Sequence, residues 1–209
     1  EIIDASAGVM IGRGDLGVEV PLEELPIIQR RLVKECSMHG KRSIVATHLL
    51  ESMIENPLPT RAEVTDVANA TYEEADCVML SGETTVGKYP TKAVQFLDRI
   101  CRRIETSGGI GWAKQKEADN DKAKLARAAV ELAENMKADG ILVVTRRGIM
   151  ADHVTSFHPG KPPVLAFTNM STTRRRLIMN RGCYPLRIDF SSDPEKTIQN
   201  AFLTIQKKK

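Results

Sequence analysis

Short apolar runs alternate with segments of helical periodicity along the whole chain. In its first hundred residues the apolar runs are Val9–Ile11, Ser43–Thr47 and Cys77–Ser81, and small or polar residues follow each run. Short apolar runs bounded by turn residues are typical of buried strands. Helix-like segments separate these runs, and that alternation predicts parallel strands whose carboxyl ends gather the functional residues.

Helix start and stop signals delimit the segments between these strands. The spacing predicts a helix over Leu22–His39 that ends at Gly40, because glycine is the common residue just past a helix end. Thr60 and Glu63 form a capping box that begins the next helix, and a loop over 82–90 leads to a helix over Thr91–Glu105. The residues expected on the buried helix faces are Ile28, Leu32, Cys36, Val64, Val67, Ala68, Thr71, Val94, Leu97, Cys101 and Ile104.

The pattern breaks between Thr106 and Asn120, where a glycine-rich stretch precedes the only tryptophan, Trp112. A second strand and helix series follows, which predicts a small layered domain with a mainly parallel sheet. Its expected strands are Ile141–Thr145, Val164–Thr168 and Pro185–Ile188, and its expected helices are Lys122–Lys137, Met150–Phe157, Thr172–Met179 and Thr197–Gln206. The residues expected to face inward are Leu125, Ala129, Leu132 and Met136 in the first helix, and Ile198, Ala201, Phe202 and Ile205 in the last. We therefore expect one domain over 1–106, a linker over 107–120 and a second domain over 121–209.

Composition places the chain among ordinary globular proteins. Its 209 residues are 42% hydrophobic and 27% charged. A net charge of +3 and an aromatic content of 4% argue against nucleic-acid and membrane partners. The four cysteines lack paired metal-ligand spacing, so we expect reduced core cysteines of an intracellular protein. No apolar run approaches the length that spans a membrane.

The stretch from Gly8 to Pro21 carries the first candidate chemistry. Gly12, Gly14 and Gly17 surround Arg13 and Asp15 directly after an apolar run. Glycine lets the backbone approach a ligand closely, so free N–H groups can hold an anion while a neighbouring carboxylate holds a metal. The alternative is a glycine-rich turn that carries one exposed aspartate.

Four motifs resemble pyruvate kinase, in the order and spacing of that family: Gly8–Val20, Ala46–Ile54, Pro59–Val64 and Met79–Thr84. The resemblance implies phosphoryl transfer from phosphoenolpyruvate to ADP in glycolysis, giving pyruvate and ATP. It also implies a partial (β/α)8 TIM-type barrel, because a complete barrel takes about 250 residues. Residues 1–106 would be the last three strand–helix units of that barrel. Residues 121–209 would be the family's C-terminal α/β domain, without its last two strands.

The resemblance assigns roles to residues at the strand ends. Asp15 matches the metal-binding aspartate, and the backbone N–H groups of Gly14 and Asp15 would bind the substrate carboxylate. Thr47 would contact the substrate and help relay a proton, although a lone threonine more often only terminates a strand. Arg13, Ser81 and Glu83 would either border the nucleotide or brace loops, and Arg13 is also a candidate for a subunit boundary. His48 stands where the family has an amide residue, so it introduces a titrating group near the site.

A second candidate site is the loop Thr145-Arg146-Arg147-Gly148 between a strand and a helix, a geometry that favours anions. In activated pyruvate kinases this loop binds a sugar-phosphate effector through hydroxyls. Here Arg147, Ile149 and Met150 replace expected hydroxyl or basic residues, which argues for a different anion. The alternative is a surface loop with two solvated arginines.

The family would require Mg²⁺ or Mn²⁺ together with K⁺, and would act as a homotetramer on phosphoenolpyruvate and ADP. We expect the cytoplasm as its compartment, with a plastid as the alternative. By the resemblance, the catalytic lysine, the second metal carboxylate and the potassium ligands all precede Glu1. Because a single carboxylate is a poor magnesium site, we expect the chain alone to be inactive. The alternatives are a non-catalytic anion-binding or docking module and, less compatible with Thr60–Glu63 and Ser81–Thr84, another enolate-handling barrel enzyme.

Overall fold

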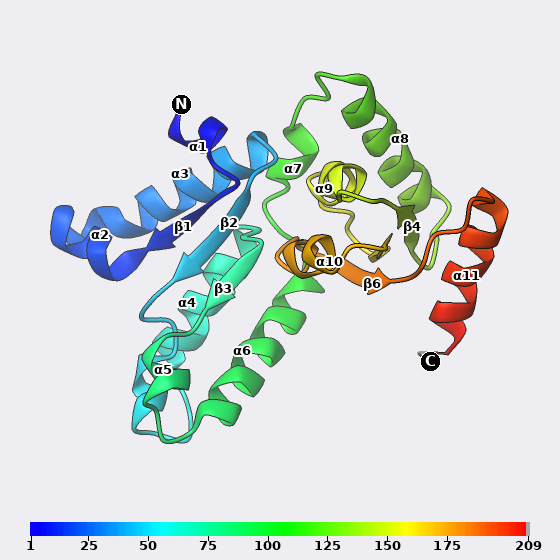
Figure 1. Cartoon of the computed structure of the whole chain (residues 1–209). Helices are drawn as coiled ribbons and strands as arrows, with labels where there is room; N and C mark the ends of the chain where they lie inside the picture. The colour runs from blue at the N-terminus through cyan, green and yellow to red at the C-terminus, as the bar shows by residue number, and fades with distance from the viewer. Residues whose placement is uncertain (208–209) are drawn as a thin grey trace. The chain divides into compact units, whose positions relative to one another are not determined.

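A computed structural model describes residues 1–207, which form two compact units that divide after Lys116. Both units are α/β, and each contains a three-stranded parallel sheet that does not close into a barrel (Figure 1). The expected fold class, a partial barrel followed by a small α/β domain with a parallel sheet, is confirmed.

The sheet of the first unit consists of β1 (Gly8–Gly12), β2 (Arg42–Ala46) and β3 (Cys77–Met79), in that order. Its register pairs Gly12 with Ala46 and Ala46 with Met79, so the three strands end at one edge. The helical segments of this unit are α1 (Ile2–Ala5), α2 (Arg13–Glu19), η1 (Leu22–Glu24), α3 (Leu25–Met38), η2 (Glu51–Ile54), α4 (Arg61–Tyr72), α5 (Gly82–Thr85), α6 (Pro90–Glu105) and α7 (Trp112–Gln115). The residues that follow each strand are therefore brought together at the carboxyl edge of the sheet.

The two main helix boundaries follow the local signals in the sequence. Gly40, at φ 62°, comes just after α3, and its N–H donates to the Ser37 carbonyl. At the start of α4, the Thr60 hydroxyl accepts from the Glu63 N–H while the Glu63 carboxylate accepts from the Thr60 N–H. The expected capping box is therefore present, and it satisfies N–H groups that have no partner within the helix.

The core of the first unit lies between its sheet and its helices. Val45, Leu49, Leu50 and Met53 are completely buried, and Val33 reaches them from α3. Because Leu49, Leu50 and Met53 all follow β2, the apolar anchors of that segment fix the polar residues beside them at the sheet edge.

The second unit has the sheet β4 (Ile141–Val144), β5 (Val164–Thr168) and β6 (Cys183–Arg187). Its helices are α8 (Asp121–Asn135), α9 (Ile149–Thr155), α10 (Ser171–Leu177) and α11 (Pro194–Gln206). The central strand β5 is buried on both faces. Val164 and Ala166 belong to one apolar cluster, whereas Phe167 packs in another with Ala201 of α11.

Three expected helix faces are wrong in part. In α8 the side chains of Leu125, Leu132 and Met136 are 62%, 59% and 70% exposed. The buried residues of that helix are Ala123, Ala126, Val130 and Ala133. Both stripes have helical spacing, and the small-residue stripe is the one that allows close packing against neighbouring elements. In the same way Ile198 and Phe202 of α11, and Val94 of α6, are exposed, while Ala201 and Ala93 are buried.

Three segments expected to be irregular contain helix. The glycine-rich stretch after β1 forms α2, although it carries Gly14 and Gly17, and the loop expected over 82–90 begins with α5. Gly17 lies where a Cβ would approach Leu25 Cδ1 to 3.2 Å, so this glycine permits close packing of α2 against the following segment. The stretch over 107–120, where we expected a linker, contains α7 with a buried Trp112.

Candidate functional site

The candidate site lies where the three strands of the first unit end. Arg13, Gly14 and Asp15 follow β1, Thr47 follows β2, and Ser81 lies two residues after β3. The backbone N–H of Gly14 donates to Thr47 Oγ1 at 2.8 Å, and the Thr47 hydroxyl donates to the Ala46 carbonyl at 2.6 Å. Residues more than thirty positions apart in the sequence are thus in direct contact.

The backbone at Thr47 and His48 is unusual. Both residues have positive φ, 69° and 53°, a conformation that is uncommon outside glycine; asparagine, aspartate and histidine adopt it more often than other residues, but threonine rarely does. Two such residues in succession cost free energy and persist only where the surrounding structure holds them, which is common at functional sites. The candidate residue Thr47 therefore sits in a conformation that its neighbours must impose.

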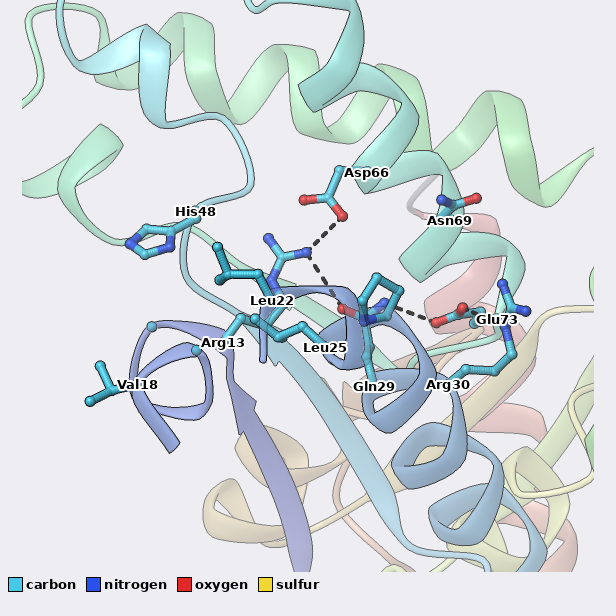
Figure 2. Close-up of a pocket in the computed structure, with 13 residues that line it drawn as sticks. Arg13, Val18, Leu22, Leu25, Gln29, Arg30, His48, Asp66, Asn69 and Glu73 are labelled. Atoms are coloured by element: carbon cyan, nitrogen blue, oxygen red, sulfur yellow. Dashed lines mark hydrogen bonds and ion pairs between the residues drawn. The ribbon is translucent and has the colours of Figure 1, made fainter. Parts of the chain in front are cut away.

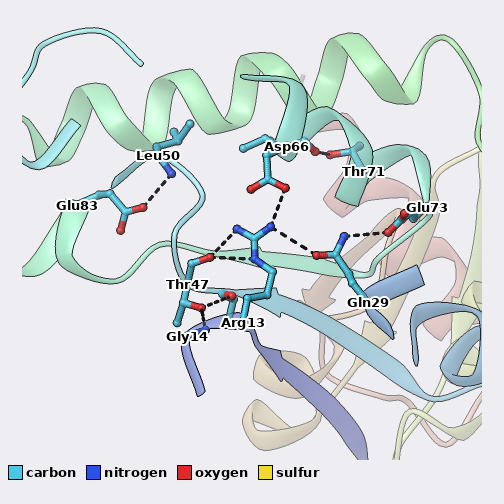
Figure 3. A network of polar contacts seen from close by, with 11 residues as sticks. Arg13, Gly14, Gln29, Thr47, Leu50, Asp66, Thr71, Glu73 and Glu83 are labelled. Atoms are coloured by element: carbon cyan, nitrogen blue, oxygen red, sulfur yellow. Dashed lines mark hydrogen bonds and ion pairs between the residues drawn. The ribbon is translucent and has the colours of Figure 1, made fainter. Parts of the chain in front are cut away.

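Arg13 supplies much of that restraint (Figure 3). Its guanidinium donates to the Thr47 carbonyl through Nε at 3.1 Å and Nη2 at 2.6 Å. Nη1 donates to Asp66 Oδ1 at 2.7 Å and to Gln29 Oε1 at 3.5 Å. Gln29 in turn donates to Glu73, which also accepts from Arg30. The side chain of Arg13 is only 9% exposed, so its contacts brace the loop rather than face solvent.

Asp15 has a different environment from Arg13. Its side chain is exposed, and one carboxylate oxygen lies near Gly12 at the end of β1. Within residues 1–207, no group of three or more histidine, cysteine, aspartate or glutamate side chains is arranged to hold a metal ion. Asp15 alone therefore supplies a carboxylate of the type that Mg²⁺ prefers, but not a complete ligand set.

Gly14 is not required by the packing of the chain itself. A Cβ at this position would meet His48 Cε1 at 3.6 Å and Thr47 Oγ1 at 3.7 Å, which are ordinary contact distances. The exposed His48 ring therefore borders Gly14. The packing of the chain does not require glycine at position 14, but close approach of a ligand to the backbone would explain it.

Glu83 connects the ends of β2 and β3. Its side chain is buried, and its carboxylate accepts from the Leu50 N–H at 3.0 Å (Figure 3). The same carboxylate accepts from the Ser81 N–H at 2.8 Å. A buried carboxylate is tolerated when such donors satisfy it. We considered two roles for Glu83 and Ser81, bordering the nucleotide or bracing loops, and these contacts fit loop bracing.

A pocket of about 400 Å³ opens beside this network (Figure 2). Val18, Leu22 and Leu25 form an apolar wall, and the polar wall includes Arg13 and Asp66. Gly14 and His48 also line the pocket, so it is continuous with the candidate site. The pocket thus combines apolar surface with a few convergent polar groups, as small-molecule sites do.

The loop expected to bind an anion lies in the second unit. The Gly148 N–H donates to Thr145 Oγ1 at 3.0 Å, and Gly148 has φ 83°, which favours glycine. Arg146 and Arg147 are exposed. Arg176 donates to the Arg147 carbonyl at 2.7 Å and pairs with Asp152 at 2.8 Å. The loop backbone is therefore held from within, while its two arginine side chains face solvent.

Sequence reasoning missed Gln29, Asp66 and Glu73, because their contacts with Arg13 and Arg30 join different helices and leave no local pattern.

Sequence reasoning also missed part of the role of Glu63. The capping box predicted its bond to Thr60, but its carboxylate also accepts from the Ser52 N–H and hydroxyl, both at 2.6 Å. The pKa of Glu63 is lowered: burial alone would raise it, but the hydrogen bonds from Ser52 and Thr60 outweigh that effect.

None of the helices within residues 1–207 combines the length and apolar character needed to cross a bilayer.

Comparisons with known proteins match both units. The family described as "Pyruvate kinase, barrel domain" matches residues 1–94, and "Pyruvate kinase, alpha/beta domain" matches residues 123–209. Pyruvate kinase isozyme G, chloroplastic, from Ricinus communis is 41% identical over 96% of this chain and 48% of its own length. A pyruvate kinase from Dictyostelium discoideum is 40% identical over 96% of the chain and 41% of its own length. A crystal structure of a pyruvate kinase from Cryptosporidium parvum is similar with a TM-score of 0.94 and 34% identity, over 99% of this chain and 43% of that one. The chain thus spans less than half the length of these relatives.

Proposed function

Because the chain belongs to the pyruvate kinase family, we propose that it forms part of an enzyme that transfers the phosphoryl group of phosphoenolpyruvate to ADP. The observation that carries the proposal is the contact of Gly14 with Thr47 at the carboxyl edge of the sheet. In barrels of this kind, catalytic residues come from the ends of several strands. Phosphoryl transfer depends mainly on positioning and on neutralising charge, and this edge offers both a carboxylate and backbone N–H groups.

In this proposal Asp15 supplies one carboxylate for Mg²⁺ or Mn²⁺, and the other carboxylate comes from outside the chain. A divalent cation held there would supply Lewis-acid chemistry by neutralising negative charge on the substrate. The backbone N–H groups of Gly14 and Asp15 would bind the substrate carboxylate, and the Gly14 N–H would exchange its present acceptor, Thr47 Oγ1, for the substrate. The Thr47 hydroxyl already bonds to the Gly14 N–H, so it lies within reach of a group bound there and would help relay a proton.

The remaining properties of the family extend the proposal. We expect K⁺ as a second cofactor, a homotetramer as the assembly and ADP and ATP as the nucleotides. The catalytic lysine and the potassium ligands would come from outside this chain, so the 209 residues alone should have negligible activity. The compartment would be the cytoplasm or a plastid, and several relatives carry plastid names.

A chimera provides the test. This chain would replace the matching part of the Dictyostelium discoideum enzyme, and pyruvate formation from phosphoenolpyruvate and ADP would be measured. We expect an active chimera, and Thr47→Val should lower kcat by about 100-fold because proton relay typically contributes at least that much. Thr47→Ser keeps the hydroxyl and should retain most activity. A chimera that folds and assembles but is inactive would refute the proposal, and equal rates for Thr47→Val and Thr47→Ser would refute the role of the hydroxyl.

A second candidate function is a non-catalytic module that binds an anion or docks onto another subunit. The exposed side chains of Arg146 and Arg147, on a loop whose backbone is fixed by Arg176, favour the anion. Titration of the isolated chain with inorganic phosphate, followed by NMR, would test it. Shifts at Gly148 that disappear in an Arg146→Gln, Arg147→Gln double variant would support anion binding at this loop, and no saturable shift would exclude it.

A further inference from the structure

The segment 107–116 folds back onto the first unit. The division between the units falls after Lys116, so this segment belongs to the first unit. Trp112 is only 7% exposed and packs in the core cluster that contains Val33 and Leu50. The Ile110 N–H donates to the Tyr72 carbonyl at 3.2 Å. The glycine-rich stretch is therefore not a free linker, although its composition suggests one.

Glu74 is the main polar anchor of this segment. Its carboxylate accepts from the Gly111 N–H through Oε1 and from the Trp112 N–H through Oε2, both at 3.1 Å. The side chain is 9% exposed, and the residue has φ 64° just after the end of α4. Each oxygen of this buried carboxylate thus accepts one hydrogen bond, and both bonds exist only while residues 107–116 are docked on the first unit.

The glycines of the segment fit this docking. Gly108 and Gly111 have φ 90° and 81°, which side chains rarely adopt, and a Cβ at either position would meet no atom within 4 Å. They are therefore needed for backbone conformation rather than for space. Gly109 is needed for space, because a Cβ there would come within 2.6 Å of Glu74 Cγ and Oε1.

The chain becomes part of the second unit within a few residues. Ala118 packs against the cluster of that unit, and the Asn120 side chain accepts from the Ala123 N–H at 3.0 Å to cap α8. The side chains of Glu117 and Asp119, on either side of Ala118, are exposed, so the pivot falls at residues 117–119. Hinges are typically a few residues of this kind.

We propose that residues 107–116 form a latch, closed by the Glu74 carboxylate on the Gly111 and Trp112 N–H groups, which sets the reach of the second unit. With the latch closed, the pivot between the units is confined to the residues just after Lys116. With it open, the ten residues of the latch join the tether and lengthen its maximum span by about 35 Å. Glu74 thus switches the connection between short and long.

Hydrogen exchange of the unmodified chain gives the first test. The amides of Gly111 and Trp112 should exchange at least about tenfold more slowly than those of Glu117 and Asp119, because only the former are hydrogen-bonded in the closed latch. Equal exchange rates for the two pairs would overturn the proposal without any variant being made.

Trp112 is the only tryptophan in the sequence, so in a chain that remains folded its fluorescence reports on whether residues 107–116 are docked in the core of the first unit. Glu74→Ala should shift its emission to the red and raise its acrylamide quenching, and trypsin should then cut after Lys114 about tenfold faster. Glu74→Gln keeps one acceptor oxygen, so its emission, quenching and cleavage rate should lie between those of the unmodified chain and of Glu74→Ala. Glu105→Ala removes an exposed acid at the end of α6 and serves as the control. A folded Glu74→Ala chain with unchanged emission and unchanged cleavage would refute the latch.

Discussion

Replacing Arg13 by alanine should destabilise the first unit strongly. The guanidinium is 9% exposed, and it makes four hydrogen bonds, two of them to the Thr47 carbonyl. Removing it leaves that carbonyl and Asp66 without their partner in a partly buried setting. Removal of one partner from a buried ion pair costs about 3–5 kcal/mol. Because Asp66 is 35% exposed and water can replace part of the contact, we expect the lower end, about 3 kcal/mol.

Urea unfolding followed by Trp112 fluorescence measures this change in the first unit, where the tryptophan lies. With a slope of about 2 kcal/mol per molar urea, a loss of 3 kcal/mol lowers the midpoint by roughly 1.5 M. Arg13→Lys keeps the charge but not the planar fork that reaches Thr47 and Asp66 together. Its urea midpoint should therefore fall between those of the unmodified chain and of Arg13→Ala.

Arg102→Ala is the matched control. Arg102 pairs with Asp98 one helical turn away and is 71% exposed, so its loss should change the free energy of unfolding by about 0.5 kcal/mol or less. If Arg13→Ala shifted the midpoint as little as this control, the network around Thr47 would not restrain the loop. The positive φ at Thr47 would then not be imposed by this network.

Three further predictions follow from side chains outside that network. Thr60→Ala removes the cap of α4 and should cost about 1 kcal/mol in the same urea assay, whereas Thr60→Ser should cost much less. Because the pKa of Glu63 is lowered from 4.5 in the folded chain, its stabilising contribution is complete above that value and is lost as the pH falls through the lowered pKa. Glu63→Gln should therefore weaken the dependence of stability on pH below 4.5, and an unchanged acid limb would contradict this. Burial, with a smaller effect of Asp76 and Glu35, raises the pKa of the Cys36 thiol to about 11, so iodoacetamide at pH 8 should label Cys36 only after unfolding, and rapid labelling of the native chain would exclude its burial.

The order of strands and helices could be predicted because it is determined by interactions between residues that are close in the sequence. The apolar runs, the capping box at Thr60 and the glycine at position 40 each reflect forces that act within a few residues. The buried faces of α8 and α11 could not be predicted in the same way. In α8 an alanine stripe competes with a stripe that contains Leu125 and Leu132, and only the packing partners decide which one is buried.

The candidate site likewise contains residues that the sequence could predict and residues that it could not. Asp15, Thr47 and Glu83 could be selected because each follows a strand, where parallel strands end at one edge, and because the resemblance to pyruvate kinase assigns roles to residues there. The partners that hold this edge could not, because Gln29, Asp66 and Glu73 act across helix contacts. The conformation of Thr47 also lay beyond the pattern, since threonine gives no local signal for a positive φ.

The acidic residues of α4 and its C-terminal turn explain how these distant parts are joined. Glu63 holds the Ser52 segment, Asp66 holds Arg13, Glu73 holds Gln29 and Arg30, and Glu74 holds the segment that contains Trp112.

Carboxylates at a helix N-terminus are favourable, but Glu73 and Glu74 lie at the C-terminal end, where the helix dipole opposes negative charge. Two adjacent acids in that position are therefore a signal that each has a partner elsewhere in the fold. Their partners here are the cation of Arg30 with the Gln29 amide in one case, and two backbone N–H groups in the other. The dipole makes both carboxylates depend on those partners, so the same helix end that completes the network behind Thr47 also anchors the start of the connection to the second unit.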